Sequence, residues 1–363
     1  MSKILYCASS LSHINSFHLP YIEELRRRGH EVFVLANGED ADFNIPFEKK
    51  ITSARNFKEV KRIRKILDTE GFDTAILNTS LASFFVRLAM RKKARPATVN
   101  VVHGYLFPLY AKGLRARLKR SVLLLAERLL RKKTDKVVTM NSEDTAIALK
   151  YRLGTCVSEC SGMGITADGV ERNRNKLRSE LAMDKKTVIF FAGELSARKN
   201  QELLISLMPE IRAEITNAEL WLAGDGDKLD GQIKLKEKLG IQDCVRHLGK
   251  IDNVRDYMAA CDLYVSAANI EGLPFNIVEA LTEGADVVAS DIKGHRDILE
   301  DGAGLLFTPG DKEDAKSKML SLLLGRVSID SEAKRTAAMR YERSRVFQET
   351  LLKITTENER TRI

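Results

Sequence analysis

The sequence has few of the features that mark secreted, membrane-spanning or disordered proteins. Its 363 residues include only five Cys, an odd number without framework spacing, which argues against a set of disulfides. No apolar run approaches the ~20 residues of a membrane helix, and the first residues show no signal peptide. Apolar residues make up 44% and charged residues 30%, which excludes global disorder. We therefore expect a reduced, cytosolic, globular protein.

Positive charge is concentrated in the first part of the chain. The net charge is +9, yet residues 1–165 hold 29 Lys+Arg against 16 Asp+Glu, so the remainder is net negative. Residues 111–136 carry ten basic residues against Glu127 and Asp135. In this segment apolar residues recur at helical spacing, at Leu114, Leu118, Val122, Leu125, Leu129 and Leu130.

Three interpretations of this basic segment remain open. A packed helix with a solvated charged face explains the pattern, and so does an interfacial helix that binds anionic lipid. The same charge suits nucleic acid, but the chain lacks a helix-turn-helix, RNA-platform or zinc-finger pattern. We expect peripheral membrane contact through residues 111–136 and no nucleic-acid partner.

Strand-like apolar runs alternate with helical patterns along the whole chain. The runs lie at 3–8, 31–36, 74–78, 98–102 and 136–140, and then at 187–192, 219–223, 245–248, 263–266 and 286–289. This alternation predicts parallel sheets covered by helices on both faces. The polar, unperiodic stretch 154–173 predicts a domain boundary. We expect an α/β protein with two doubly wound, Rossmann-like domains, whose ligands bind at the carboxyl ends of the strands.

The strongest chemical signal runs from Ser266 to Leu281, where a strand leads into a helix. Gly272 allows close backbone approach, and Pro274 suits the first helical turn. The free N–H groups of that turn favour a phosphate, and Glu271 and Glu279 can accept hydrogen bonds from sugar hydroxyls. On spacing alone, a plain helix start with a surface glutamate explains the segment equally well.

Two glutamates in this strand–EGxP–helix setting resemble the signature of the GT-B family 4 retaining glycosyltransferases. Further matches follow one another along the chain, at His103-Gly104, Gly162-Met-Gly164-Ile165, Ala192 to Asn200, Leu222 to Gly226, Val245 to Gly249 and Gly294 to Asp297. The resemblance covers nearly the whole chain and is nearest to the branch that builds capsular, exopolysaccharide or O-antigen repeats.

The resemblance implies a GT-B architecture with three parts. Residues 1–165 would bind the acceptor and residues 166–330 the nucleotide sugar. The helical tail at 331–363 would cross back to the first domain.

The resemblance also implies roles for individual residues. Glu279 would bind the ribose of the nucleotide, and Glu271 would contact the donor sugar. Lys199, together with Arg198, would neutralise the diphosphate. Many relatives have Arg directly after the glycine of this motif, where the present chain has Glu194, so Arg198 is expected to substitute for it.

Four further residues complete the expected site. The backbone of Gly272 and Leu273 would cradle the diphosphate. His103 would lie near the sugar and the reacting centre, and His247 would flank the base. No protein nucleophile and no metal are implied, and no cofactor beyond the donor is expected.

The resemblance implies an enzyme that moves a hexose or N-acetylhexosamine, with retention, from a nucleotide sugar, expected to be a UDP-sugar, to a lipid-linked saccharide. We expect it at the inner face of the cell membrane, in cell-surface polysaccharide biosynthesis. One alternative is a UDP-sugar epimerase on the same fold, which would need no acceptor. The other is a basic membrane- or nucleic-acid-binding protein without catalysis.

Weaker signals have simpler explanations. Asp225-Gly-Asp227 matches a metal-binding pattern but follows a predicted strand and favours a turn. Gly162-Met-Gly164 lacks the third glycine of a dinucleotide fingerprint.

The remaining candidates are two cysteines and two histidines. Cys156 and Cys160 lack further zinc ligands, so we expect a loop or a helix there. His13 and His18 fit either a loop with a helix cap or an acceptor site.

Overall fold

The computed structural model describes residues 1–105, 113–166 and 172–355. The chain forms two compact units. Unit 1 comprises Met1–Gly164 and Arg343–Ile363, and unit 2 comprises Ile165–Glu342. The change of unit therefore falls between residues 164 and 165, and the chain returns to unit 1 at Arg343.

Unit 1 contains a seven-stranded sheet in which all paired strands are parallel. The order is β3-β2-β1-β4-β5-β6-β7, with bounds β1 Lys3–Cys7, β2 Glu31–Ala36, β3 Phe43–Asn44, β4 Thr74–Asn78, β5 Ala97–Val102, β6 Lys136–Thr139 and β7 Cys156–Glu159. Every residue of β4 is buried. Continuous apolar runs of this kind are expected where helices cover both faces of a sheet.

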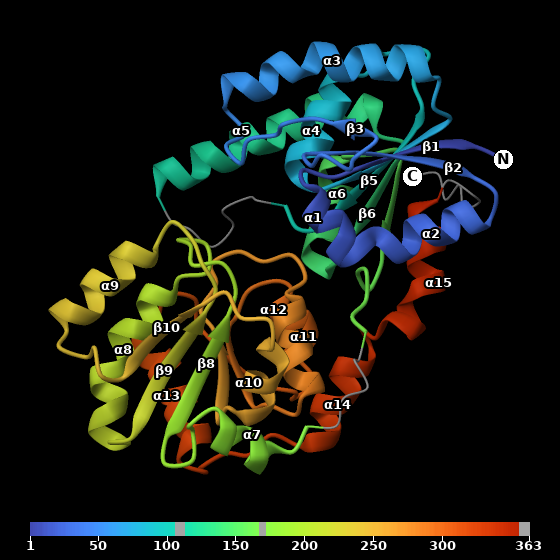
Figure 1. The fold of residues 1–363 in the computed structure, drawn as a ribbon. Helices are drawn as coiled ribbons and strands as arrows, with labels where there is room; N and C mark the ends of the chain where they lie inside the picture. The colour runs from blue at the N-terminus through green and yellow to red at the C-terminus, as the bar shows by residue number, and fades with distance from the viewer. Residues whose placement is uncertain (106–112, 167–171, 356–363) are drawn as a thin grey trace. The chain divides into compact units, whose positions relative to one another are not determined.

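The helices of unit 1 cover both faces of this sheet. They are α1 Leu11–His13, α2 Leu19–Arg27, α3 Ala54–Glu70, α4 Ser80–Ala89, α5 Leu114–Leu130, α6 Ser142–Tyr151 and α15 Arg343–Ile354. Figure 1 shows α3, α4 and α5 on one side of the sheet and α2 and α15 on the other. The Phe347 ring of α15 lies 4.6 Å from the Tyr21 ring of α2, measured between centroids. Helix α15 is thus packed within the N-terminal unit.

One face of α5 is fixed to the unit by a buried ion pair. Arg87 of α4 is 1% exposed and donates to both carboxylate oxygens of Glu127, at 2.9 and 3.0 Å. Leu123 and Leu124 pack against the neighbouring core. The 3₁₀ turn Arg131–Lys133 ends the helix. These contacts orient α5 about its own axis.

Unit 2 contains a six-stranded sheet whose paired strands are also all parallel. The order is β10-β9-β8-β11-β12-β13, with bounds β8 Thr187–Ala192, β9 Ala218–Ala223, β10 Val245–Gly249, β11 Leu263–Ser266, β12 Val287–Ser290 and β13 Leu305–Phe307. One buried hydrophobic cluster of this unit joins strand residues such as Ile189 and Val265 to Leu207 of α8.

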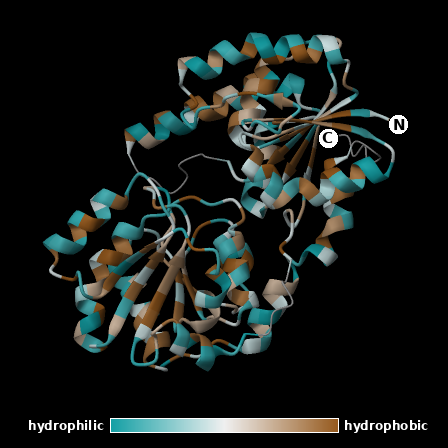
Figure 2. Cartoon of the chain, in the orientation of Figure 1, coloured by the Kyte–Doolittle hydropathy of each residue, from teal (hydrophilic) through white to brown (hydrophobic). Residues whose placement is uncertain are grey.

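The helices of unit 2 are α7 Arg174–Glu180, α8 Gln201–Glu214, α9 Leu229–Lys238, α10 Val254–Ala260, α11 Phe275–Thr282, α12 His295–Leu299, α13 Lys312–Leu323 and α14 Ser331–Met339. In Figure 1, α8, α9 and α13 lie on one side of the sheet, and α10, α11 and α14 lie on the other. Figure 2 shows mostly hydrophobic strands and mostly hydrophilic outer helix surfaces in each unit.

Each sheet has one point where the strand order reverses. This switch point lies between β1 and β4 in unit 1 and between β8 and β11 in unit 2. On the two sides of such a point the connections leave toward opposite faces of the sheet, so the loops that follow the two strands open a crevice. The fold class predicted from the sequence, two doubly wound α/β units, is confirmed.

Two local details differ from the expectation. The stretch 154–173, expected to lack regular structure, contains strand β7, which pairs along the edge of the sheet with β6. Cys156 lies in that strand rather than in a loop or a helix, whereas Cys160 lies in the loop that directly follows it. The helical tail is divided into two helices, α14 in unit 2 and α15 in unit 1, because the chain turns between Met339 and Arg343. Residues 356–363 of the expected tail lie outside the described residues.

Candidate functional site

The loops after β8 and β11 meet at the switch point of unit 2. The backbone N–H of Asn269 donates to the Arg198 carbonyl at 2.8 Å, and the Asn269 side chain donates to the Ala197 carbonyl. These bonds hold the Lys199 segment against the segment that leads to Glu271. The two motifs are 72 residues apart in sequence, and strand order alone brings them together.

Glu271 is the centre of a charged cluster between these loops. Its Oε1 lies 2.7 Å from Nζ of Lys199 and 2.6 Å from Nη1 of Arg198. Glu271 and Lys199 are only 9% and 7% exposed. Burial would raise the pKa of Glu271, but the two cations outweigh it and hold this pKa below the ordinary value. The carboxylate is therefore ionised at neutral pH and can only accept hydrogen bonds.

Arg198 also lies close to Glu194, the residue found where many relatives of the resembled family have Arg. Its Nη2 lies 3.6 Å from Oε2 of Glu194, while its Nη1 holds Glu271. Arg198 is 34% exposed at its side chain, whereas that of Lys199 is 9% exposed. An anion that enters this loop therefore meets one buried and one accessible cation.

Glycines let the backbones of the site approach one another. A Cβ on Gly294 would lie 2.1 Å from the Gly272 carbonyl oxygen, and a Cβ on Gly224 would lie 2.0 Å from that of Gly193. Gly294 and Gly224 also have φ of +69° and +132°, a region that side chains disfavour. Gly272 and Leu273 precede α11 and are both buried.

Glu279 lies inside α11, eight positions after Glu271 in the sequence. Burial raises its pKa above the ordinary value, with opposing effects from Arg255 and Glu283. Its carboxylate makes no hydrogen bond or ion pair with any residue in the described part of the chain. A partly buried carboxylate without a partner is suited to bind hydroxyl donors of a ligand.

His247 is tied to the same loop through two buried amides. Its Nε2 donates to Gln232 Oε1 at 3.2 Å, Gln232 donates to Gln201, and Gln201 donates to the Glu194 carbonyl at 2.8 Å. Burial, followed by the nearby Lys236, lowers the pKa of His247 to about 4. Its Nδ1 is buried and has no partner among the described residues. The strand end thus presents a neutral ring with a free lone pair.

His295 is a member of this site that received no role from the sequence. It is fully buried at the start of α12, its Nδ1 donates to the Ser290 carbonyl at 2.8 Å, and its Nε2 lies 3.4 Å from Oγ of Ser266. Burial lowers its pKa to about 4, although Glu271 opposes the shift. The Gly294-His295 pair in the sequence was the available signal, but only the structure shows that it joins the ends of β11 and β12.

The switch point of unit 1 carries histidines. His103 follows β5, and His13 and His18 follow β1. Their ring centroids lie 5.1 Å (His13–His18), 5.1 Å (His13–His103) and 5.2 Å (His18–His103) apart. Burial lowers the pKa of His103 to about 3 and also lowers the pKa of His13 and His18. All three rings are therefore neutral at physiological pH.

Local backbone structure explains how His13 and His18 come to lie side by side. Residues Ile14–His18 form a π-helical turn, and Leu19 N–H bonds back to the Ile14 carbonyl. Such a wide turn places residues five apart on one side of the helix. Helical spacing of three or four residues would not predict this pair.

The Asp225-Gly-Asp227 pattern lies in the loop after β9, and a turn begins within it, where the Leu229 N–H bonds to the Gly226 carbonyl. Gly226 N–H bonds to the side chain of Asp225, and the Asp225 carbonyl accepts from Leu195 N–H. Within the described ranges, the one group of three or more metal-ligating side chains in mutual reach is His13, His18 and His103. The five cysteines are free thiols.

Comparisons with known families agree with this geometry. Residues 173–343 match the family model for glycosyl transferases group 1, and residues 21–157 match that for glycosyltransferase family 4. These matches support a glycosyltransferase of the family 4 type. The Bacillus subtilis protein EpsD, named as a glycosyltransferase, is 29% identical over 326 residues, which is 85% of this chain and 84% of EpsD.

Two relatives from Escherichia coli are more distant. The O-antigen biosynthesis glycosyltransferase WbnH is 26% identical over 73% of this chain and 70% of its own. A UDP-Gal:α-D-GlcNAc-diphosphoundecaprenol α-1,3-galactosyltransferase is 22% identical over 69% of this chain and 66% of its own. Together with EpsD, they support a role in polysaccharide biosynthesis.

Solved structures establish the fold. Sucrose-phosphate synthase from Thermosynechococcus elongatus has a TM-score of 0.74 at 18% identity, covering 97% of this chain and 96% of that one. HepE from Anabaena, in complex with UDP-glucose, has a TM-score of 0.73 at 20% identity, covering 96% and 98%. The fold of this chain is GT-B.

Proposed function

We propose that this protein is a retaining glycosyltransferase that moves a hexose or N-acetylhexosamine from a UDP-sugar to a lipid-linked saccharide. The observation that carries the proposal is the Lys199–Glu271–Arg198 cluster at the switch point of unit 2, directly before α11. Cations and a carboxylate lie together there, as a sugar diphosphate requires. The similarity to HepE, which is solved with UDP-glucose, and to a galactosyltransferase named for a GlcNAc-diphosphoundecaprenol acceptor supports the donor and acceptor classes.

The charges suit the breaking of a glycosyl–phosphate bond. Negative charge builds on the leaving diphosphate, and Lys199, Arg198 and the backbone of Gly272 and Leu273 would stabilise it. We propose that these groups replace a metal ion in donor binding. Positive charge builds on the sugar, where the ionised Glu271 accepts hydroxyl hydrogen bonds.

The other residues have supporting roles in this proposal. Glu279, whose carboxylate has no hydrogen-bond or ion-pair partner among the described residues, would bind the ribose hydroxyls. His247 would present its Nδ1, which also lacks a partner there, beside the base. His103, as a neutral imidazole, would contact the reacting sugar. The retaining mechanism needs no covalent protein intermediate and rests on the family resemblance.

Nucleotide binding is the first test. Thermal unfolding with UDP, GDP, ADP, CMP, TDP and NAD compares the wild type with Glu279→Ala. A ligand at 100 times its Kd adds about 2.7 kcal/mol to stability, so we expect a selective shift with UDP that is lost in the variant. Glu237→Ala, an exposed glutamate on α9, is the matched control and should keep the shift. A shift that survives in Glu279→Ala contradicts the ribose role.

Acceptor dependence separates the proposal from the epimerase alternative. We expect release of UDP from a UDP-sugar only when an undecaprenyl-diphosphate saccharide is present, with a mass increase of one hexose or N-acetylhexosamine on the acceptor. Conversion of one UDP-sugar into its epimer without an acceptor would establish the alternative. Because the donor is common to both, the nucleotide shift alone does not decide between them.

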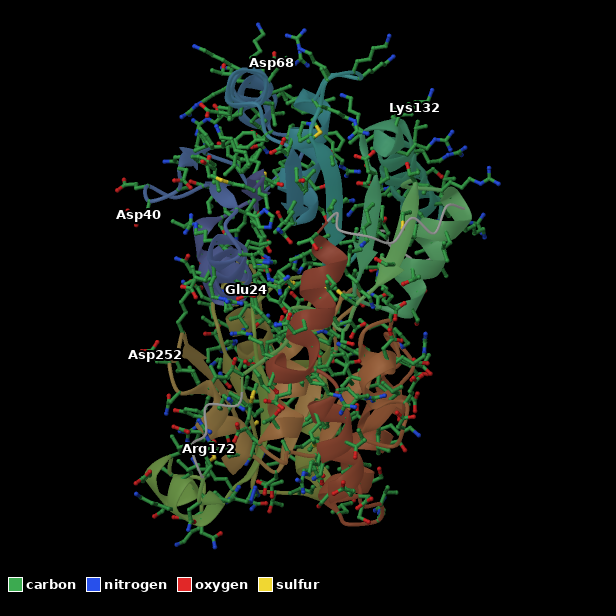
Figure 3. All side chains as sticks on the ribbon, turned by 90° about the vertical axis from the view of Figure 1, so that its right-hand side faces the viewer. Glu24, Asp40, Asp68, Lys132, Arg172 and Asp252 are labelled. Atoms are coloured by element: carbon green, nitrogen blue, oxygen red, sulfur yellow. The ribbon has the colours of Figure 1, made fainter. Side chains whose placement is uncertain are left out.

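We further propose that α5 holds the protein at an anionic membrane surface. The face of α5 opposite the Arg87–Glu127 pair carries a stripe of apolar side chains that are 57–82% exposed, at Leu114, Leu118, Val122, Leu125 and Leu129. Five basic residues accompany it, at Arg115, Arg117, Lys119, Arg120 and Arg128. Lys132, in the turn after α5, projects away from the unit in Figure 3. Residues 111 and 112 of the predicted basic segment lie outside the described residues.

The exposed apolar stripe and the basic residues of α5 match the two attractions of an anionic bilayer. Each Lys or Arg near such a surface contributes about 1 kcal/mol, and the leucines add burial in the headgroup region. Among the described residues, no helix has both the length and the hydrophobicity to traverse a bilayer. The proposed contact is therefore a helix that lies on the surface.

Vesicles that contain phosphatidylglycerol test this contact. Co-sedimentation of Leu118→Ser should fall about tenfold against the wild type, since the loss of one inserted leucine removes about 1.5 kcal/mol or more. Leu352→Ser, which changes a similarly exposed leucine on α15, should bind as the wild type does. Equal binding of both variants, or equal binding to neutral vesicles, would contradict the proposal, and retention on RNA instead would favour a nucleic-acid partner.

A further inference from the structure

The three histidines at the switch point of unit 1 have the geometry of a metal site. Nε2 of His18 lies 3.3 Å from Nε2 of His13, and one ring nitrogen from each of His13, His18 and His103 lies within 4.8 Å of the others. The ring centroids form a nearly equilateral triangle, with sides of 5.1, 5.1 and 5.2 Å.

These spacings agree with three imidazoles on one tetrahedral ion. Zinc–nitrogen bonds of about 2.0–2.1 Å at tetrahedral angles separate the nitrogens by about 3.3 Å and the ring centroids by about 5.2 Å. Hydrogen bonds between the three rings do not by themselves explain why all three lie together. Among the described contacts, the His13–His18 pair is the one hydrogen bond between the rings, and His103 bonds to Asn78 instead.

Neighbouring side chains fix the orientation of the rings. Tyr6 Oη lies 2.9 Å from Nδ1 of His18, on the side of the ring opposite Nε2. Asn78 donates its N–H to the Cys7 carbonyl, which leaves its Oδ1 to accept from Nε2 of His103 at 3.3 Å. Partners of this kind orient metal-binding histidines in known sites. His18 and Tyr6 are fully buried, whereas His13 and His103 are partly exposed, so the open side of the triangle is accessible.

We propose that His13, His18 and His103 bind a divalent transition-metal ion, with zinc as the best match. An all-imidazole ligand set suits zinc and its neighbours, whereas Mg²⁺ and Ca²⁺ require oxygen ligands. Three protein ligands leave the fourth position to water or to an oxygen of a ligand. The site lies wholly in unit 1 and uses none of the donor residues of unit 2. It shares His103 with the proposed sugar contact, so its test measures metal binding directly and without a nucleotide sugar.

Direct metal binding tests this site. Full-length, tag-free protein is stripped with a chelator and titrated with Zn²⁺ against a chromophoric chelator, and with Co²⁺ while its visible spectrum is recorded. We expect one equivalent of metal per chain and the absorption of tetrahedral cobalt. His13→Ala should lose both, and His30→Ala, a histidine of the same unit outside the cluster, should keep both.

A second variant keeps the test informative if His13→Ala fails to fold. Tyr6→Phe removes only the hydroxyl beside His18 and should lower zinc affinity about 10–100-fold, the range found for partners of metal ligands. Far-UV circular dichroism of both metal-free variants should match that of the wild type. The proposal is overturned if the wild type takes up no stoichiometric zinc at micromolar concentration, or if His13→Ala and Tyr6→Phe bind zinc like the wild type.

Discussion

The two units share one architecture but place opposite kinds of groups at their switch points. In unit 2 the loops after β8 and β11 hold ionised side chains, with Lys199 and Arg198 on Glu271. In unit 1 the segments after β1 and β5 hold neutral imidazoles, and β4 ends with the amide of Asn78 beside them. The same crevice of a doubly wound sheet thus presents charged side chains in one unit and neutral rings in the other.

The overall charge of the two halves runs against this local pattern. The first 165 residues carry the positive charge of the chain, yet their switch point is neutral, because the basic residues lie on outer helices such as α3 and α5. The remainder is net negative, yet its switch point presents two cations. Net charge therefore predicts what the outer surface attracts, and the loops at the strand ends predict what the site binds.

The buried cation of unit 1 gives the largest expected effect. Arg87→Ala leaves Glu127 partly buried without its partner, and loss of one member of such a pair destabilises a protein by about 3–5 kcal/mol. Urea unfolding should show this loss. Arg91→Ala, which breaks the exposed pair with Asp68, should change stability by less than about 1 kcal/mol. Similar losses in both variants would mean that the ion pair does not anchor α5.

Removal of the buried cation of unit 2 should affect catalysis instead. Lys199→Ala should lower kcat/KM about 10²–10³-fold, because one fixed donor to the developing diphosphate charge is lost. Arg198→Ala should have a smaller effect, since its side chain is more exposed. Lys238→Ala on the surface of α9 is the control. Steady-state transfer assays measure all three, and wild-type turnover of Lys199→Ala would refute the assignment.

Backbone contact at the unit 2 site can be tested with one methyl group. Gly294→Ala puts a Cβ 2.1 Å from the Gly272 carbonyl at φ +69°, and strained positions of this kind destabilise by about 1–3 kcal/mol. We expect lower stability together with weaker UDP binding, since the loop before α11 must shift. Gly302→Ala, with φ +81° but open space around it, separates backbone strain from the clash. Equal UDP affinity in both variants would show that the contact is unimportant for the site.

Acid should weaken both units through their buried histidines. Folding lowers the pKa of His247 and His295 from 6.5 to about 4 and that of His103 to about 3. Their stabilisation is complete above pH 6.5, where unfolded histidine is neutral, and it is lost as the pH falls through the folded pKa values. For each of these histidines, the free energy of unfolding falls by up to about 1.4 kcal/mol per pH unit in that window.

Unfolding free energies at pH 7.5, 6.0 and 5.0 measure this slope. His247→Gln and His103→Asn should each reduce it, the first through unit 2 and the second through unit 1. Unfolding free energy that stays constant from pH 7.5 to 5.0 would contradict the neutral, buried state of these rings.

Much of the fold could be predicted from the sequence because its signals are local. A continuous apolar run such as that of β4 predicts a buried parallel strand, and the periodicity of 275–283 predicts the helix that is observed as α11. Strand β7 was missed because edge strands are short and half-exposed, so their pattern is weak. The break between α14 and α15 was missed because it depends on which unit each helix packs against.

For the candidate site, too, one part could be predicted from the sequence and the other required the structure. The sequence by itself determined which chemical groups follow the strands, because Lys199, Glu271 and His103 can be identified from residue type and motif alone. Only the tertiary structure decided which of them meet. The order of the parallel strands brings the Lys199 and Glu271 loops together across 72 residues, and a π-helical turn places His13 beside His18. Such contacts depend on long-range packing, which no local pattern of residues encodes.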